Sequence, residues 1–91
     1  MKIQNLINAN GNANANQFVI NDGNKIYFQS YDSIVCKIEN GKVTLGKDWN
    51  YSTTTSKHLY TFLKQNGFYE LADRKAILKA IKNKELEVKN L

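Results

Sequence analysis

The sequence predicts an α+β domain in which an antiparallel four-stranded meander sheet carries one or two helices packed on one face. Three observations predict it. Residues 1–50 alternate apolar and polar side chains between turn-forming asparagine and glycine, whereas residues 51–91 place apolar side chains at helical spacing. A chain of 91 residues can also bury one modest core and not two. We therefore expect a single domain over residues 1–91, mainly strands before about residue 50 and mainly helical after it.

Two hairpins are expected in the first half. Residues 21–24 (Asn-Asp-Gly-Asn) tolerate the positive φ of a tight turn, and Asn40-Gly41 between alternating apolar runs is a strong hairpin signal. Residues 30–33 (Ser-Tyr-Asp-Ser) form a polar connection whose side chains can bond the local backbone. The expected strands are residues 18–20, 26–28, 34–38 and 43–45, with inward-facing side chains that include Phe18, Phe28, Ile34, Cys36 and Ile38.

A first helix is expected after residues 51–56 (Tyr-Ser-Thr-Thr-Thr-Ser), because a hydroxyl there can cap the first turn. Asn66-Gly67 supplies a residue that can end this helix in the left-handed conformation. Its apolar stripe is Leu59, Phe62 and Leu63.

A second helix is expected from about Leu71 or Asp73 to Lys82. After it, Leu86 and Val88 alternate with charged residues, which favours a short C-terminal edge strand over a frayed helical tail. The apolar stripe of the second helix is expected to hold Ala76, Ile77, Leu78, Ala80 and Ile81.

The N-terminal segment gives a weaker signal. The apolar residues Ile3, Leu6 and Ile7 fit either a short strand or one helical turn. Residues 10–16 alternate asparagine with small residues, and asparagine competes with its own backbone, so we expect a flexible loop. The alternative is an irregular strand whose asparagine amides face a partner.

The net charge of +5 lies mainly in the second half, where residues 51–91 carry seven lysines and one arginine against four carboxylates. Twelve of the 13 basic residues are lysine, a hydrated point charge that suits weak attraction to a polyanion better than base-specific recognition. An AT-rich genome would produce the same bias. If the protein binds nucleic acid, the expected contacts are Lys57, Lys64, Arg74, Lys75, Lys79 and Lys82.

Catalytic chemistry is weakly represented, and we expect no enzyme. The sequence contains one histidine, His58, and one cysteine, Cys36, which is expected to pack in the core. No residues have metal-ligand spacing, and neither a phosphate-binding glycine loop nor a dinucleotide fingerprint is present, so no metal or cofactor is expected. If the protein is nevertheless an enzyme, we expect a small hydrolase in which His58 acts near Asp32, Ser33 or Ser52. This hypothesis is weaker than binding to a partner protein or to nucleic acid.

The chain is expected to work away from membranes. No apolar run approaches the ~20 residues that span a bilayer, and none after Met1-Lys2 resembles the apolar segment of a signal peptide. A lone cysteine cannot form an internal disulfide, which favours a reducing compartment.

Three stretches resemble a family of small uncharacterised proteins encoded by bacteriophages, prophages and other mobile elements. The stretches are residues 14–20 (Asn-Ala-Asn-Gln-Phe-Val-Ile), residues 27–34 around Ser-Tyr-Asp-Ser, and residues 49–58 around Tyr-Ser-x-Thr-Thr-x-Lys, with Phe62-Leu63 after them. The similarity covers roughly residues 1–65, with the C-terminal strand as a further candidate, and residues 66–82 look like an added helix. No catalytic residue carries over from this family.

What the resemblance implies is a protein of the bacterial cytoplasm linked to phage biology. Small non-enzymatic phage proteins often bind a host protein, including components of anti-phage defence such as a CRISPR nuclease. The resemblance therefore favours an inhibitor or modulator of a host factor, with non-specific nucleic-acid binding as the alternative. The oligomeric state does not follow from the sequence.

The two signature stretches of the resemblance, Ser-Tyr-Asp-Ser at residues 30–33 and Tyr-Ser-x-Thr-Thr-x-Lys at residues 51–57, are expected to converge. If the first helix begins near residues 30–33, Asp32 would complement the positive end of the helix dipole and the hydroxyls would close a polar network. Such a corner can be purely structural, or it can be a binding face. Five tyrosines are also more than a small core readily buries, and tyrosine is enriched in interfaces. The residues expected to contact a partner are Tyr31, Asp32, Trp49, Tyr51, Lys57 and His58.

Overall fold

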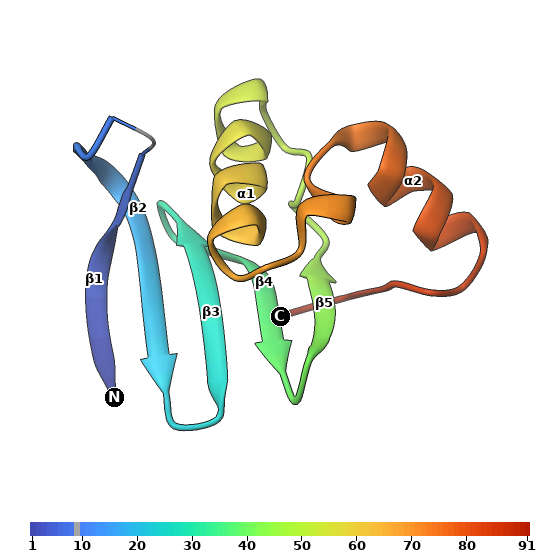
Figure 1. Ribbon diagram of the computed structural model, residues 1–91, viewed down its shortest axis with the longest axis horizontal. Coiled ribbons are helices and arrows are strands. Elements are labelled where there is room, and N and C mark those ends of the chain that lie inside the picture. Colours follow the sequence, from blue (N-terminus) through green and yellow to red (C-terminus); the bar gives the residue numbers. More distant parts are fainter. Residues whose placement is uncertain (9) are drawn as a thin grey trace.

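The computed structural model describes residues 1–8 and 10–91, which form one six-stranded sheet with two α-helices on one of its faces (Figure 1). The strand order is β1-β2-β3-β4-β5-β6, so each strand pairs with its neighbour in the sequence. The strands are β1 (Lys2–Ile7), β2 (Ala13–Asp22), β3 (Lys25–Ser30), β4 (Ser33–Glu39), β5 (Lys42–Gly46) and β6 (Glu87–Lys89). The helices are α1 (Thr53–Gln65), the short 3-10 helix η1 (Tyr69–Leu71) and α2 (Arg74–Lys82). The α+β class is confirmed, and the expected four-stranded meander is the β2–β5 part of a larger sheet.

Both expected hairpins are present, and their turns have the predicted backbone. Gly23 has φ 67°, and Asn40 and Gly41 have φ 53° and 76°. Glycine reaches these angles without steric penalty, and asparagine tolerates them better than most residues. The local turn signals therefore set the register of β2 against β3 and of β4 against β5.

The loop expected over residues 10–16 is wrong for residues 13–16, which belong to β2; its first residue, Ala13, pairs with Ile7 of a strand β1 at the sheet edge. The pairing is irregular, with a register shift between Asn5 and Ile7. Side-chain amides bridge it: Asn5 Nδ2 donates to the Asn14 carbonyl at 3.0 Å, and Asn14 Nδ2 donates to the Leu6 carbonyl at 3.0 Å. The alternative of an irregular strand is thus nearer the structure, but these amides bond to the neighbouring strand.

Phe18 does not face the core as expected. Its neighbour Val19 pairs with the buried Phe28, and successive side chains of a strand point to opposite faces of a sheet. Val19 therefore lies on the helix-covered face, and Phe18 lies half-buried on the open face. Period-two alternation identifies two faces, but only the pairing shows which one is covered.

β4 contains a second departure from simple alternation. Phe28 pairs with Cys36 but Gln29 pairs with Ile34, so Val35 is the extra residue of a β-bulge. Val35 and Cys36 are both fully buried, whereas Ile34 is only partly buried and pairs on the open face. The expectation that Ile34 shares the inner face with Cys36 is therefore wrong.

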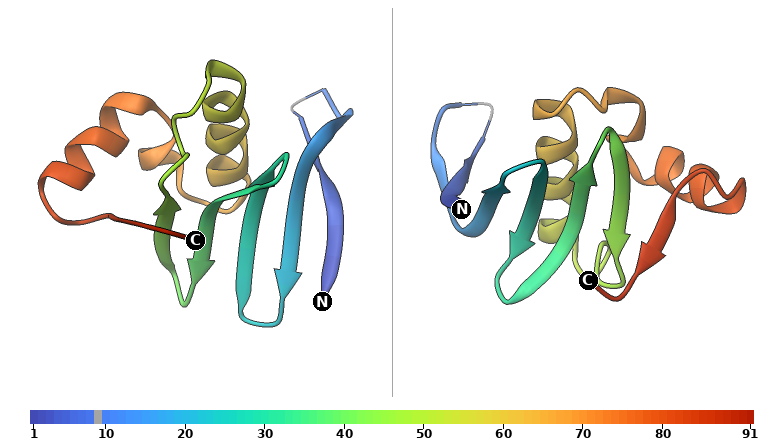
Figure 2. Two further views of the ribbon diagram at one scale, coloured as in Figure 1. Left: turned by 180° about the vertical axis from the view of Figure 1, so that it is seen from behind. Right: turned by 90° about the horizontal axis from the view of Figure 1, so that it is seen from below.

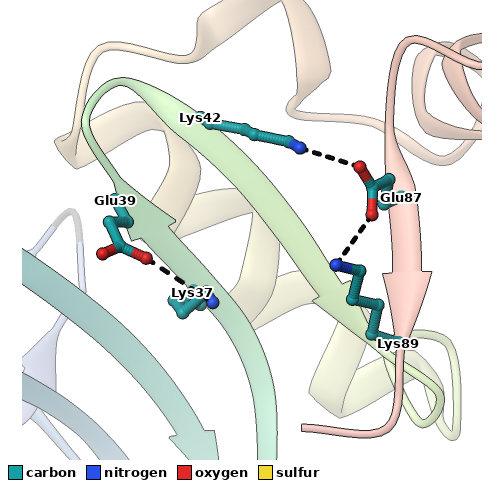
Figure 3. Close-up of polar contacts among 5 residues, drawn as sticks. All are labelled: Lys37, Glu39, Lys42, Glu87 and Lys89. Atoms are coloured by element: carbon teal, nitrogen blue, oxygen red, sulfur yellow. Dashed lines mark hydrogen bonds and ion pairs between the residues drawn. The ribbon is translucent and has the colours of Figure 1, made fainter.

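The expected C-terminal strand is present as β6, which pairs with β5 in parallel register. On the open face, Glu87 accepts from Lys42 Nζ at 2.7 Å and lies 3.0 Å from Lys89 Nζ (Figure 3). A second ion pair, Lys37–Glu39 at 3.7 Å, lies beside it on β4. The two lysines that bond to Glu87 hold the pKa of its carboxyl well below the ordinary value of 4.5.

Acid is expected to loosen β6. A carboxyl whose pKa is lower in the folded than in the unfolded state stabilises the fold at any pH above its unfolded-state pKa. This contribution is lost as the pH falls from the unfolded-state pKa to the folded-state pKa. Contacts of Val88 with β5, followed by NMR, should weaken as pH falls from about 5 to about 2. In a Glu87→Gln variant these contacts should be weaker at neutral pH and should no longer change over that interval. Equal acid sensitivity in both proteins would contradict the role of Glu87.

The first helix begins and ends where the sequence predicts. Ser52 is the N-cap and accepts from the Thr55 N–H at 3.1 Å. At the other end Gly67, with φ 86°, donates to the Lys64 carbonyl, and Phe68 donates to the Leu63 carbonyl. These two bonds form a Schellman motif, which satisfies carbonyls left free at a helix end.

The second helix starts after Asp73, whose side chain accepts from the Ala76 N–H at 2.8 Å. Ile77 and Ala80 are buried, as expected, but Leu78 is 45% exposed and lies with the lysines of α2. Seen from below, both α-helices lie on the same side of the sheet, with α2 toward the β5 and β6 side (Figure 2). A nine-residue helix can cover only a small area of the core, so the full apolar stripe is not buried.

The core lies between the sheet and the two helices. Its centre includes Phe28 of β3 and Phe62 of α1, whose rings stack with centroids 5.6 Å apart. The buried apolar residues are Leu6, Phe28, Val35, Cys36, Ile38, Val43, Leu45, Trp49, Leu59, Phe62, Leu63, Ile77, Ala80 and Leu86.

Candidate binding site

A cleft of about 480 Å³ opens where the turn between β3 and β4 meets the N-terminal end of α1. We call it the corner cleft. Residues from both signature stretches line it, so the expected convergence of residues 30–33 with the start of α1 is present. The lining residues are Ser30, Tyr31, Asp32, Ser33, Val35, Asp48, Tyr51, Ser52 and Thr55.

Buried hydroxyls connect the sheet to the helix beside this cleft. Ser30 Oγ lies 3.2 Å from Thr55 Oγ1, and Ser52 Oγ donates to Thr55 Oγ1 at 3.1 Å. Ser30 and Thr55 are almost fully buried, so an unbonded hydroxyl at either position would be destabilising. The predicted hydroxyl network is therefore present. Asp32 lines the cleft as an exposed residue and accepts no side-chain hydrogen bond from the residues that the structure describes.

Tyr31 is held in a conformation that bulky residues seldom adopt. Its φ is 54°, in the left-handed region, where a non-glycine residue is destabilised by about 1–3 kcal/mol. Two hydrogen bonds hold it there: its N–H donates to the Asn16 carbonyl at 2.7 Å, and its carbonyl accepts from Gln29 Nε2 at 2.6 Å. The Tyr31 side chain remains 57% exposed at the edge of the corner cleft.

Trp49, expected at the binding face, is instead a core residue that is only 5% exposed. It anchors the segment between β5 and α1, because its N–H donates to the Gly46 carbonyl at 3.2 Å and its carbonyl accepts from Ser56 Oγ at 3.4 Å. The same segment places Asp48 and Tyr51 in the lining of the cleft, with Tyr51 81% exposed. Trp49 is buried because tryptophan has a large apolar surface, and in a small domain its burial stabilises the fold more than exposure at a binding face would.

Gly46, at the end of β5, permits a close approach of the backbones on this side of the molecule. A Cβ atom at this position would clash with the carbonyl oxygen of Ile34 and would also crowd that of Val35. Only glycine can occupy such a position without a backbone shift. Gly46 therefore lets the start of β4 lie against the end of β5, which brings the β3–β4 turn close to the segment around Asp48.

A second groove, of about 540 Å³, shares Tyr51 and Ser52 with the corner cleft. We call it the basic groove, because it brings together Lys57 of α1 and Arg74 of α2 beside Tyr60. Its lining residues are Asn50, Tyr51, Ser52, Thr53, Ser56, Lys57, Tyr60 and Arg74.

The other candidate nucleic-acid contacts lie outside this groove. Lys75, Lys79 and Lys82 line a shallow hollow on α2. Asp73, Ala76 and Leu78 line it with them. Lys64 is exposed in the last turn of α1 and lines neither surface. The structure therefore gathers five of the six residues on two surfaces that meet at the start of α2.

The structure does not place His58 in the cleft that holds the other residues of the hydrolase hypothesis. His58 is partly buried on α1 and does not line the corner cleft, which holds Asp32, Ser33 and Ser52. Burial, followed by the charge of Lys57, lowers the pKa of His58 below its ordinary value.

Cys36 is fully buried, as expected from its position in the sequence. Burial raises the pKa of its thiol to about 12, so the thiolate that a nucleophile requires does not form near neutral pH. Within residues 1–8 and 10–91, no group of three or more His, Cys, Asp or Glu side chains is placed to hold a metal ion.

Several residues that line the cleft or shape it are not identified as site residues by any pattern in the sequence. Asp48 reads as an ordinary surface charge, Val35 as an outward-facing strand residue, and Gly46 as the end of a strand. Each position depends on contacts between segments: the bulge in β4, the close approach at Gly46, and the burial of Trp49. The one feature of the sequence that singles out Asp48 is that it precedes Trp49, whose burial fixes the short connection between β5 and α1.

In the part of the chain that the structure describes, no helix is long and apolar enough to cross a membrane. No curated protein and no solved structure matches the chain. One family model does match, over residues 1–80, and its description is "Family of unknown function (DUF8033)". The match runs to Ala80, so nearly all of α2, which the resemblance suggested was an addition, lies within the family's extent. Because the match spans most of its length, the chain belongs to this family of unknown function.

Proposed function

We propose that the protein is a small, non-enzymatic binding protein that acts on a partner protein through the corner cleft. The observation that carries the proposal is the pair of exposed tyrosines at this cleft, Tyr31 and Tyr51, which are 57% and 81% exposed. Tyrosine combines a large apolar face with a hydroxyl, and it is enriched among the residues that dominate binding energy in interfaces.

The rigidity of the cleft supports the same proposal. The buried hydroxyls of Ser30 and Thr55 join β3 to α1, and two hydrogen bonds hold the strained backbone of Tyr31. A surface that is already ordered loses less conformational entropy on binding than a flexible one does. Strained backbone is also concentrated at functional sites, where the surrounding structure maintains it.

We further propose that the partner is a host factor in the bacterial cytoplasm, such as a CRISPR nuclease or another component of anti-phage defence. Support comes from the resemblance to small phage and prophage proteins, whose two signature stretches meet in this chain at the corner cleft. Expression in a defence-proficient bacterium should restore plating of a phage that the defence restricts, and should change nothing in a defence-deficient strain. Unchanged restriction across the main nuclease-based defences would contradict this form of the proposal.

The binding proposal is tested by affinity purification from a bacterial host, with the Tyr51→Ala variant and a matched control. Tyr69→Ala is the control, because Tyr69 is 70% exposed but lies on η1, outside the lining of the corner cleft. We expect a partner that survives nuclease treatment, is retained by Tyr69→Ala and is lost with Tyr51→Ala. Because Tyr51 also lines the basic groove and Tyr31 does not, the same loss with Tyr31→Asn assigns the partner to the corner cleft. A partner captured equally by all of these proteins would show that binding does not use this cleft.

A second candidate function, non-specific binding of nucleic acid, rests on the unpaired cations of α2. Arg74, Lys75, Lys79 and Lys82 make no ion pair with any residue that the structure describes, so their charge is available to a phosphate backbone. The three lysines share one exposed hollow. A lysine-rich surface of this kind attracts polyanions without reading their sequence.

Salt dependence is the test of this second function. Fluorescence anisotropy with a labelled single strand should give a log–log slope of affinity against salt of about −0.7 per neutralised phosphate. A Lys75→Gln, Lys79→Gln double variant should reduce that slope by about 1.4, because two phosphates lose their partners. A Lys25→Gln, Lys37→Gln variant, altered on the sheet, is the matched control and should keep the wild-type slope. Absence of binding at low salt would exclude this function.

A further inference from the structure

The corner cleft is lined by acidic and not by basic side chains, although the protein as a whole is basic. Its two ionisable carboxylates are Asp32 and Asp48, and no lysine, arginine or histidine is among its lining residues. Neither carboxylate forms an ion pair with a described residue, in contrast to Glu87 and Glu39 on the sheet. A chain with a net charge of +5 therefore has one cleft that is lined by two carboxylates without an ion pair to any described residue and by no basic side chain.

The start of α1 at this cleft would by itself favour an anion, so the two opposing effects must be compared. A helix N-terminus carries roughly half a positive charge, whereas two ionised carboxylates carry two negative charges. The Ser52 hydroxyl also takes up the Thr55 N–H, which leaves fewer free donors in the first turn. The net charge in the cleft is negative, and a cation is the ligand that it favours.

The remaining lining residues suit one particular cation. The exposed rings of Tyr31 and Tyr51 offer faces on which a planar guanidinium can stack, while the carboxylates accept its forked N–H donors. The hydroxyls of Ser33 and Ser52 add further acceptors. A volume of about 480 Å³ lies within the range of ligand sites and admits one long side chain with its flanking backbone.

We propose that the corner cleft takes an arginine side chain from the surface of the partner protein. This inference rests on the proposed binding function and names the chemistry that the partner must present. Arginine is favoured over lysine because its planar, delocalised charge can stack on tyrosine and bond to a carboxylate at the same time. The same charges repel the phosphates of nucleic acid, so this cleft and the cationic face of α2 recognise different partners.

The test is an NMR titration of the full chain with three blocked peptides: acetyl-Gly-Arg-Gly-amide, its citrulline analogue and its glutamate analogue. The arginine peptide should shift the amide signals of Ser33, Tyr51 and Thr55 saturably. Citrulline keeps the shape of arginine but lacks its charge, so it should bind about five-fold or more weakly. The glutamate peptide should leave these signals unchanged. Added salt should weaken binding of the arginine peptide, because the carboxylates are exposed.

An Asp32→Asn, Asp48→Asn double variant separates charge from shape. It keeps the cleft but removes both carboxylates, and it should bind the arginine peptide no better than the wild type binds citrulline. A matched Asp22→Asn, Glu70→Gln variant removes two exposed carboxylates elsewhere and should behave as the wild type does.

Failure of this inference is distinguishable from failure of the proposed function. Equal binding of the citrulline or glutamate peptide, or no shift with any peptide, overturns the arginine site. If the captured partner still depends on Tyr51 in that case, the cleft remains the binding site for different chemistry. If the arginine peptide binds but capture ignores Tyr51, the site stands and the proposed interaction through it falls.

Discussion

Replacing Trp49 with alanine is expected to destabilise the protein by about 3–5 kcal/mol, because a buried indole is removed and a cavity remains. A domain of this size has a total free energy of unfolding of about 5–14 kcal/mol, so the loss is a large share of it. The substitution keeps the backbone hydrogen bonds of residue 49 but removes the buried ring that holds the segment with Asp48 and Tyr51 against the core. Urea denaturation followed by circular dichroism measures the effect without needing the tryptophan signal.

The control for this prediction is Tyr51→Ala, which removes an aromatic ring two residues away. Tyr51 is 81% exposed, and exposed substitutions usually change stability by no more than about 0.5 kcal/mol. Trp49→Phe should lie between the two, because it keeps part of the buried ring. If Trp49→Ala kept its full stability but lost its partner, the tryptophan would be a contact residue, as the sequence first suggested.

Replacing Tyr31 with asparagine is expected to raise stability and weaken binding in the same protein. Asparagine tolerates the left-handed region better than tyrosine does, so relief of strain should add about 0.5–1 kcal/mol to the free energy of unfolding. Loss of an interface tyrosine typically removes about 2 kcal/mol of binding energy, which weakens the complex roughly thirty-fold. Urea denaturation and a titration with the captured partner measure the two effects separately.

Tyr31→Phe is the matched variant for this experiment, since it retains both the ring and the strained backbone. It should keep wild-type stability and most of the affinity, so any loss reports on the hydroxyl alone. Wild-type affinity in Tyr31→Asn would show that the ring makes no contact. A fall in its stability would show that Tyr31 contributes packing that outweighs the strain at φ 54°.

Features that depend on neighbours in the sequence were predictable. The Asn40-Gly41 turn needs two residues that tolerate positive φ. The start of α1 needs one hydroxyl, that of Ser52, which accepts a hydrogen bond from the N–H three residues later. The end of the same helix needs only Gly67. Each of these is a local steric or hydrogen-bonding preference, so the residue types announce it.

Features that depend on distant partners were not predictable in the same way. Asn14 lies in β2, where its side-chain amide donates to the carbonyl of Leu6 in β1, and residues of such weak propensity do not themselves specify this partner. The bulge at Val35 reverses the faces of its neighbours in β4, and alternation cannot reveal an extra residue. Leu78 fits the apolar stripe of α2 but has no surface to cover.

In the candidate site too, features set by neighbouring residues were predicted and features set by distant contacts were not. The meeting of residues 30–33 with the start of α1 and the hydroxyl network there were predicted, because capping and turn residues show where polar groups must be satisfied. The burial of Trp49 and the entry of Asp48 into the cleft were not. Both follow from the close approach at Gly46 and from the competition among apolar side chains for a small core.

By itself, then, the sequence determined a sheet-and-helix domain, its turns and helix ends, and a core that takes up Cys36, because these follow from short-range sterics, hydrogen bonding and apolar spacing. Only the tertiary structure decided which face of the sheet the helices cover, that β1 extends it at one edge, and that two tyrosines and two carboxylates border one cleft. Strand register and side-chain burial are set by pairing between distant segments. A residue's own type and spacing do not encode the partner that it meets there.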